Sequence, residues 1–248
     1  MAYFKSQFEN TLSLKPWLGW SLIIFFGLLR FGLVLHANIH SDYRYVSLIF
    51  MVMIILPFLL LNKKGKRLIG ISRPESLKWI FYGALLGILI CTLTYWTGNL
   101  LYGDSLNNWF MYISRSYGVE QDLLYENRWM YFGIFSLMGI TFSPLGEELL
   151  YRGLIHECFV DKYGDNQASQ IDSLAFAFAH LAHFGLLYVE GEWSFRFLPA
   201  LLWIFFMFLA SRAFYFVRVK TESIAGAIVA HAAFNLAMTY YIIFGLMG

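Results

Sequence analysis

Long apolar segments recur along this chain of 248 residues, and they constrain its fold more than any other feature. A transmembrane α-helix needs about 20 consecutive, mostly apolar residues to cross the hydrocarbon core of a bilayer. Hydrophobic residues make up 59% of the chain and charged residues 14%, whereas soluble domains are about 45–50% apolar and about 25% charged. The sequence therefore predicts an all-α fold, a polytopic membrane helix bundle of seven to eight transmembrane segments.

Seven apolar segments are separated by polar stretches, and each is expected to be helical. They cover Trp17–Leu35, Val46–Leu61, Trp79–Leu101, Trp129–Phe142, Ser173–Val189, Phe195–Phe216 and Ile224–Leu246. The fourth is short and is expected to stop at Ser143-Pro144, with a further helix after it to about Cys158. The chain has no internal repeat and no linker. Residues 1–248 are therefore expected to form a single integral membrane domain, with the motif-bearing catalytic core at about 129–246.

Basic residues are concentrated between the second and third segments, in Asn62–Lys78. By the positive-inside rule this loop is cytoplasmic, and the N-terminus is expected on the same side, in a bacterial cytoplasmic membrane. The net charge of +2 gives no reason to expect a nucleic-acid partner. Cys91 and Cys158 are the only cysteines, so neither a disulfide framework nor a cysteine metal cluster is expected.

Three charged residues, Glu147, Glu148 and Arg152, lie between apolar segments. A charge at the centre of a membrane helix costs about 2.5–3.5 kcal/mol, so these groups need partners or a function. Glu148 and Arg152 are four positions apart and can pair on one helix face. Glu147 is rotated by about 100° from Glu148 and need not share that partner. One carboxylate can then be structural while the other stays free for chemistry; the alternative is an interfacial salt-bridge cluster.

Arg30 is a further charge within an apolar segment, and it is expected to snorkel, to pair or to pack at the interface. Two later segments carry polar residues at helical spacing: Phe176, His180 and His183 in one, and His231 and Asn235 in the other. Taken singly, each is typical of a hydrogen-bonded packing residue. Together with Glu147 they offer a general base for water and donors for a developing oxyanion. Hydrolysis of an amide bond is the reaction class that uses both.

The ordered motifs resemble the CPBP family, the CAAX prenyl proteases and bacteriocin-processing enzymes also known as Abi proteins. The motifs are E-E-x-x-x-R (Glu147, Glu148, Arg152), F-x-x-x-H (Phe176, His180) and H-x-x-x-N (His231, Asn235). The resemblance implies an intramembrane, glutamate-dependent endopeptidase of about eight helical segments, with its site open toward the cytoplasmic side.

The resemblance also assigns roles to individual residues. It implies that Glu147 and His180 activate the water, and that His231 and Asn235 form the oxyanion hole. It further implies that the site is held together by the remaining motif residues, Glu148, Arg152 and Phe176. His183 is an additional histidine beside the second motif, where it is expected to support the catalytic residues.

Metal use and substrate remain open from the sequence. Glu147, His180 and His231 could bind zinc and leave a position for water, although the resemblance favours a metal-free site without a cofactor. The expected partner is a membrane-associated peptide or protein, such as a CAAX-like lipidated tail, a peptide leader or a membrane protein. Two other classes compete: a non-catalytic bacteriocin immunity or scaffold protein, and a haem or quinone protein. No oligomeric state is predicted.

Overall fold

Four helices in the computed structural model, which describes residues 3–246, are long and apolar enough to cross a membrane. They are α1 (Pro16–His40), α4 (Leu77–Tyr102), α10 (Phe197–Thr221) and the segment Ile224–Leu246, which comprises α11 (Ile224–Tyr240) and a π-helical end (Tyr241–Leu246). A fifth apolar helix, α2 (Val46–Leu60), is shorter. The chain is therefore an integral membrane protein. The predicted number of seven to eight spans is not confirmed, because the other helices are shorter or carry charged residues.

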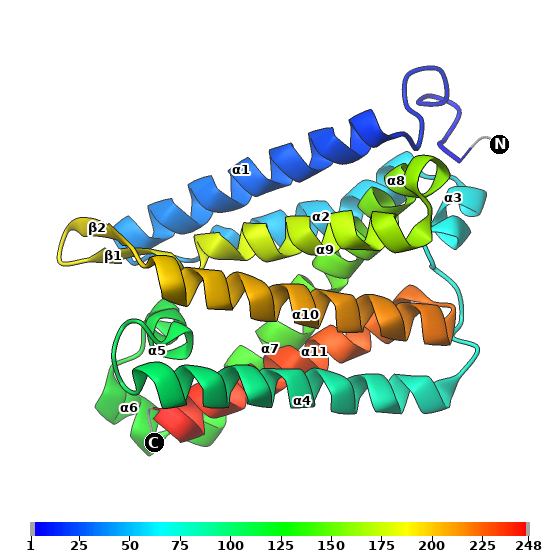
Figure 1. The fold of residues 1–248 in the computed structure, drawn as a ribbon. Coiled ribbons are helices and arrows are strands. Elements are labelled where there is room, and N and C mark those ends of the chain that lie inside the picture. The colour runs from blue at the N-terminus through cyan, green and yellow to red at the C-terminus, as the bar shows by residue number, and fades with distance from the viewer. Residues whose placement is uncertain (1–2, 247–248) are drawn as a thin grey trace.

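The last helix, α11, lies at the centre of the bundle. It packs against α4, α10 and α7 (Arg128–Glu147), and these helices lie side by side in Figure 1. Small residues permit the close approach, as expected for membrane helices. A Cβ atom on Gly87 of α4 would lie 2.0 Å from the carbonyl oxygen of Ala230 in α11. Glycine at this position therefore allows the two backbones to touch.

Short elements occupy the two ends of the bundle (Figure 1). At one end, beside the N-terminus, lie α3 (Lys63–Leu68) and α8 (His156–Tyr163). At the other end lie α5 (Trp109–Ser114), a 3₁₀ turn (Arg115–Tyr117) and α6 (Gln121–Glu126). Asn62 caps α3, because its side chain accepts hydrogen bonds from the backbone N–H groups of Lys64 and Gly65.

The predicted segment Ser173–Val189 is wrong at both of its ends. The helix there, α9 (Asp165–Ala179), begins earlier, and a 3₁₀ turn (His180–Ala182) follows it. The chain then forms an antiparallel hairpin of β1 (Leu186–Val189) and β2 (Glu192–Phe195), so the fold is not entirely α-helical. Glu190 and Gly191 have φ angles of 53° and 85°, and two positive angles are what a two-residue type I′ hairpin turn requires.

The predicted helix stop at Ser143-Pro144 is also wrong. Pro144 lies inside α7, which continues to Glu147 and then passes into a π-helical segment (Glu148–Ile155) and α8. Proline removes one backbone donor, but neighbouring helices and local changes of helical pitch allow membrane helices to contain it. The continuous helix carries both glutamates of the motif into the centre of the bundle.

Candidate active site

Glu147 and Glu148 lie where α7 passes into the π-helical segment, and both side chains are fully buried. Short π-helical stretches within α-helices occur frequently at functional sites. Two adjacent buried carboxylates need cations or hydrogen-bond donors, because an unpaired buried charge is very costly. The structure gives each carboxylate its own partners.

Glu148 is held by Arg152 and His231. The Nε atom of Arg152 lies 3.2 Å from Oε2 of Glu148, which is the ion pair that the four-residue spacing predicts. This contact is electrostatic, because the geometry does not make it a hydrogen bond. The other oxygen, Oε1, lies 2.7 Å from Nδ1 of His231. A carboxylate can only accept, so Nδ1 carries the proton and Nε2 faces Glu147, with 3.6 Å between Nε2 and Oε2.

The guanidinium of Arg152 lies against aromatic rings. Its Cζ atom is 4.2 Å from the ring centre of Phe176 and 5.6 Å from that of Phe214. Asp172 lies 4.0 Å away, and the guanidinium has no hydrogen-bond partner among the described residues. Cation–π attraction is strongest where water is absent, so these rings stabilise the buried charge. Phe176 also packs against His180, with 4.2 Å between the ring centres.

Glu147 is bound by a residue from a distant part of the chain. Its Oε1 accepts a hydrogen bond from Nη1 of Arg30 in α1, and its Oε2 accepts one from the hydroxyl of Ser143 at 3.2 Å. Arg30 lies inside an apolar segment of the sequence, where a charged side chain needs a partner. The structure shows that this partner is Glu147, a contact that sequence spacing cannot identify.

His180 and His183 face Arg30 from the turn after α9. Nδ1 of His180 lies 2.8 Å from the carbonyl oxygen of Phe176, so it carries the proton and leaves the lone pair on Nε2. That Nε2 lies 3.4 Å from Nη2 of Arg30. Nε2 of His183 accepts hydrogen bonds from Nε and Nη2 of Arg30, at 3.1 and 3.0 Å. Both imidazoles therefore present an unprotonated nitrogen to the guanidinium.

Asn235 lies one turn beyond His231 on α11. Its amide donates a hydrogen bond of 3.0 Å to the carbonyl oxygen of Gly139 in α7. A side-chain amide has two N–H donors, so one of them remains for another acceptor.

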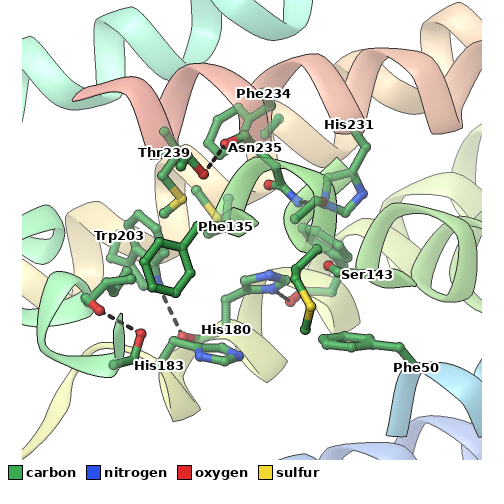
Figure 2. A pocket seen from close by; sticks show the side chains of 18 of the residues that line it. Phe50, Phe135, Ser143, His180, His183, Trp203, His231, Phe234, Asn235 and Thr239 are labelled. Carbon is green, nitrogen blue, oxygen red and sulfur yellow. Dashed lines mark hydrogen bonds between the residues drawn. The ribbon is translucent and has the colours of Figure 1, made fainter. Parts of the chain in front are cut away.

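These side chains surround one cavity of about 280 Å³, the central pocket. Figure 2 shows His231 and Asn235 on one wall and His180 and His183 on another. The walls beyond are mostly apolar and include Phe50, Ile113, Tyr117, Phe135, Met138, Trp203 and Met207. Arg30 and Ser143 line the pocket, whereas Glu147, which both of them bind, lies behind them.

The sequence-based site residues therefore fall into one region of the structure. Each of the eight is in this region: Glu147, Glu148, Arg152, Phe176, His180, His183, His231 and Asn235. Their catalytic roles remain predictions. The alternative zinc ligands, Glu147, His180 and His231, do not close around a shared point, because Arg30 lies between Glu147 and His180. Within residues 3–246, no three His, Cys, Asp or Glu side chains are arranged to hold a metal ion.

A second polar cluster lies beside this site and contains none of the residues of the three motifs. His156 contacts Asp172 through Nδ1 at 2.8 Å and Asp165 through Nε2 at 3.0 Å. Tyr215 of α10 donates a hydrogen bond to Asp165. Asp172 is fully buried and lies between His156 and Arg152. The cluster thus links the motif arginine to the end of the bundle that carries α8.

Comparison with known families gives a match to part of the chain. Residues 129–237 match the family described as type II CAAX prenyl endopeptidase Rce1-like, in agreement with the motif resemblance. No curated protein and no solved structure matches the chain. The matched residues include all three motifs, but they exclude α1 and therefore Arg30.

Proposed function

We propose that this chain, which carries an Rce1-like type II CAAX prenyl endopeptidase domain over residues 129–237, hydrolyses a peptide bond of a membrane-associated substrate. The family supports endopeptidase activity in general. The observation that carries the proposal is the pair His180 and His231 at the polar end of an otherwise apolar pocket, with Glu147 buried directly behind the lining residues Arg30 and Ser143. Buried titratable groups that converge on a pocket are typical of a functional site.

In the proposed reaction, water attacks the carbonyl carbon of the scissile bond. One water proton passes to Glu147 or to the Nε2 lone pair of His180 as the C–O bond forms. The same proton is then delivered to the leaving nitrogen as the C–N bond breaks, giving a new carboxyl group and a new amine. The tautomer of His180 supports this role, because its Nδ1 proton is engaged by the carbonyl of Phe176.

His231 and Asn235 are proposed to stabilise the oxyanion of the tetrahedral intermediate. Asn235 has a remaining N–H donor, and His231 can donate from Nε2 once that nitrogen is protonated. The carboxylate of Glu148 accepts the Nδ1 hydrogen bond and so holds Nε2 toward Glu147. Arg152 and Phe176 are proposed to hold Glu148 and His180 in place.

Activation without a metal is the proposed version of this chemistry. A guanidinium already lies beside Glu147, where a zinc ion bound to the alternative ligands would need to be. Exhaustive chelation tests the choice: activity should survive it. Loss of activity that only added zinc restores would establish the zinc enzyme instead.

The side of the membrane on which the substrate binds is part of the proposal. Basic residues near α3 and the end of α10 support a cytoplasmic position for that end of the bundle and for the N-terminus. His231 lies seven residues into α11, about 10 Å from that end. The central pocket, however, extends from there toward Tyr117, near the opposite end. The proposed cytoplasmic opening therefore needs a test by labelling.

The first experiment avoids a guess at the substrate, which we propose to be a lipidated tail, a peptide leader or a membrane protein. Wild type and Glu147→Ala would be expressed at equal levels in a host lacking the gene, and new protein termini would be compared across the membrane and secreted proteins. A terminus found only with the wild type supports proteolysis and identifies the substrate. If both proteins fold, protect the host equally and produce no new terminus, the non-catalytic immunity or scaffold alternative replaces the proposal.

A further inference from the structure

The charge balance of the site leads to a residue outside the motifs. Two adjacent carboxylates, Glu147 and Glu148, are fully buried, but the E-E-x-x-x-R motif supplies a single cation. Arg152 lies beside Glu148, and the second cation comes from α1, where Arg30 binds Glu147. We propose that Arg30, held by His183, is a positioning residue that fixes the place and orientation of Glu147 as the general base. The inference rests on the proposed hydrolysis.

The geometry of Arg30 uses each branch of its guanidinium. Nη1 donates to Glu147, Nη2 faces His180, and Nε and Nη2 both donate to His183. The ring of Phe50 in α2 lies 5.7 Å from Cζ. The side chain is 3% exposed, so it does not reach toward water as an interfacial arginine would. Arg30 therefore joins three elements, α1, α7 and the turn after α9, at a single point.

The cation is needed because of what surrounds Glu147. Apolar surroundings do not compensate a buried carboxylate, so the position of Glu147 depends on a positive charge close to it. Arginine remains charged at all relevant pH values, so it supplies that charge reliably. The charged or titratable groups that face Glu147 from the elements around it are few: Arg30, His231, Glu148 and Tyr151, with His180 and His183 beyond Arg30.

His183 has a role in this arrangement that the motifs do not give it. Its Nε2 accepts two hydrogen bonds from Arg30, and such paired contacts fix the plane of the guanidinium. Without His183, Arg30 would keep its charge but lose its orientation toward Glu147. The two residues therefore act as a unit, with the charge on Arg30 and the orientation from His183.

The split between kcat and KM separates this role from a purely structural one. The substrate is the Glu147-dependent one found by comparing termini, and the variants are Arg30→Met, Arg30→Lys and His183→Gln. Arg30→Met should lower kcat by about 10²-fold or more and leave KM nearly unchanged, because the base is misplaced while the pocket walls remain. Arg30→Lys keeps the charge and should recover part of the lost kcat. Arg44→Met, an exposed arginine just beyond α1, is the matched control.

A second measurement does not depend on activity. Thermal midpoints would be compared for Arg30→Met, Glu147→Gln and the double variant in the same detergent. Each single variant leaves one buried charge unpaired, so each should lower the midpoint by on the order of 10 °C, whereas the double variant should recover most of that loss. Additive losses, or an unchanged kcat in Arg30→Met, would overturn the proposal. If the wild type cleaves no substrate but the double variant recovers its thermal midpoint, the proposed function fails. The pairing of Arg30 with Glu147 is then still supported.

Discussion

His231 and Glu148 are joined by a 2.7 Å hydrogen bond between Nδ1 and Oε1, although 83 positions separate them in the chain. This bond fixes the imidazole so that Nε2 lies 3.6 Å from Glu147. A carboxylate at one nitrogen of a histidine sets which tautomer is present and stabilises its protonated form. The second glutamate of the motif therefore acts on the site through His231.

Replacing Glu148 by glutamine tests this relationship. The amide oxygen can still accept the Nδ1 hydrogen bond, but that bond is no longer charge-assisted and the ion pair with Arg152 is lost. We expect the rate of cleavage to fall by about 10²–10³-fold, as when an oxyanion donor is lost. The measurement is the rate of Glu147-dependent cleavage in detergent. Glu157→Gln is the matched control, since Glu157 pairs with Arg218 away from the pocket and its loss should leave the rate unchanged.

Arg152 is expected to contribute stability more than chemistry. Arg152→Met leaves Glu148 without its cation, and breaking a buried pair in this way should lower the free energy of unfolding by about 3–5 kcal/mol. Phe176→Leu removes the ring below the guanidinium and should cost about 2 kcal/mol or more. Denaturant unfolding in detergent measures both. Arg44→Met, which breaks an exposed pair with Asp42, should change stability little. Equal losses of stability in Arg152→Met, Phe176→Leu and Arg44→Met would contradict the cation–π account.

Gly146 precedes Glu147 at a point where α7 touches α2. A Cβ atom there would lie 2.7 Å from the carbonyl oxygen of Phe50, so Gly146→Ala must push the two helices apart. We expect a loss of about 1–3 kcal/mol, the cost of overpacking, together with reduced activity because Glu147 moves with the helix. Gly133→Ala in the same helix meets no atom within 4 Å and should be neutral or stabilising, because alanine favours a helix over glycine by about 1 kcal/mol.

The aspartate at the start of α9 gives a prediction about pH. Burial acts to raise the pKa of Asp165, but hydrogen bonds from Tyr215 and His156 outweigh it and lower the pKa below its usual value. A carboxyl whose pKa is lower in the folded state stabilises the fold above its unfolded pKa of about 3.9, and this stabilisation is lost as pH falls through the folded value. The midpoint of wild type should exceed that of Asp165→Asn at pH 6, and the difference should shrink below pH 4. A constant difference would contradict the assignment.

Much of the fold follows from local sequence properties. The predicted segments Trp17–Leu35, Trp79–Leu101, Phe195–Phe216 and Ile224–Leu246 each correspond to one of the four membrane-length helices, because length and apolar composition suffice to define them. The hairpin was missed, because Leu186–Val189 is too short and too apolar to be distinguished from the end of a helix. The pair Glu190-Gly191 marks the turn of the hairpin, but a pair with a single glycine is a weak turn signal. Proline usually ends a helix in a soluble protein. Pro144 nevertheless lies inside α7, because membrane helices tolerate proline.

The site is predictable only where its contacts are local. The pair of Glu148 with Arg152 follows from a spacing of four residues. The contact between Arg30 and Glu147 joins residues 117 positions apart, and no periodicity in either segment identifies it. His156 lies in the helix predicted to continue to about Cys158, and Asp172 lies in the polar stretch after it; both are fully buried. These contacts depend on the packing of segments that are far apart in the chain, and that packing cannot be read from a single sequence.

The orientation of the bundle can be tested with single cysteines, because the native Cys91 and Cys158 are fully buried and should react slowly. Lys64→Cys reports on the basic end, in α3, and Glu192→Cys reports on the hairpin at the opposite end. The positive-inside rule predicts that an impermeant maleimide labels Glu192→Cys in intact cells and Lys64→Cys only after permeabilisation. Wild type gives the background. The reverse labelling pattern would mean that the bundle has the opposite orientation, with the N-terminus outside.

The same labelling determines how a substrate enters the central pocket. Ser116 lies on the pocket wall in the 3₁₀ turn after α5, near the hairpin end, so Ser116→Cys reports on that side of the cavity. If the pocket opens to the cytoplasm, as the family resemblance predicts, Ser116→Cys should resist the impermeant reagent in intact cells and react in inverted vesicles. Labelling from outside would mean that the pocket opens at the hairpin end. The substrate would then be an exported or membrane-embedded segment, because a cytoplasmic lipidated tail would not reach it.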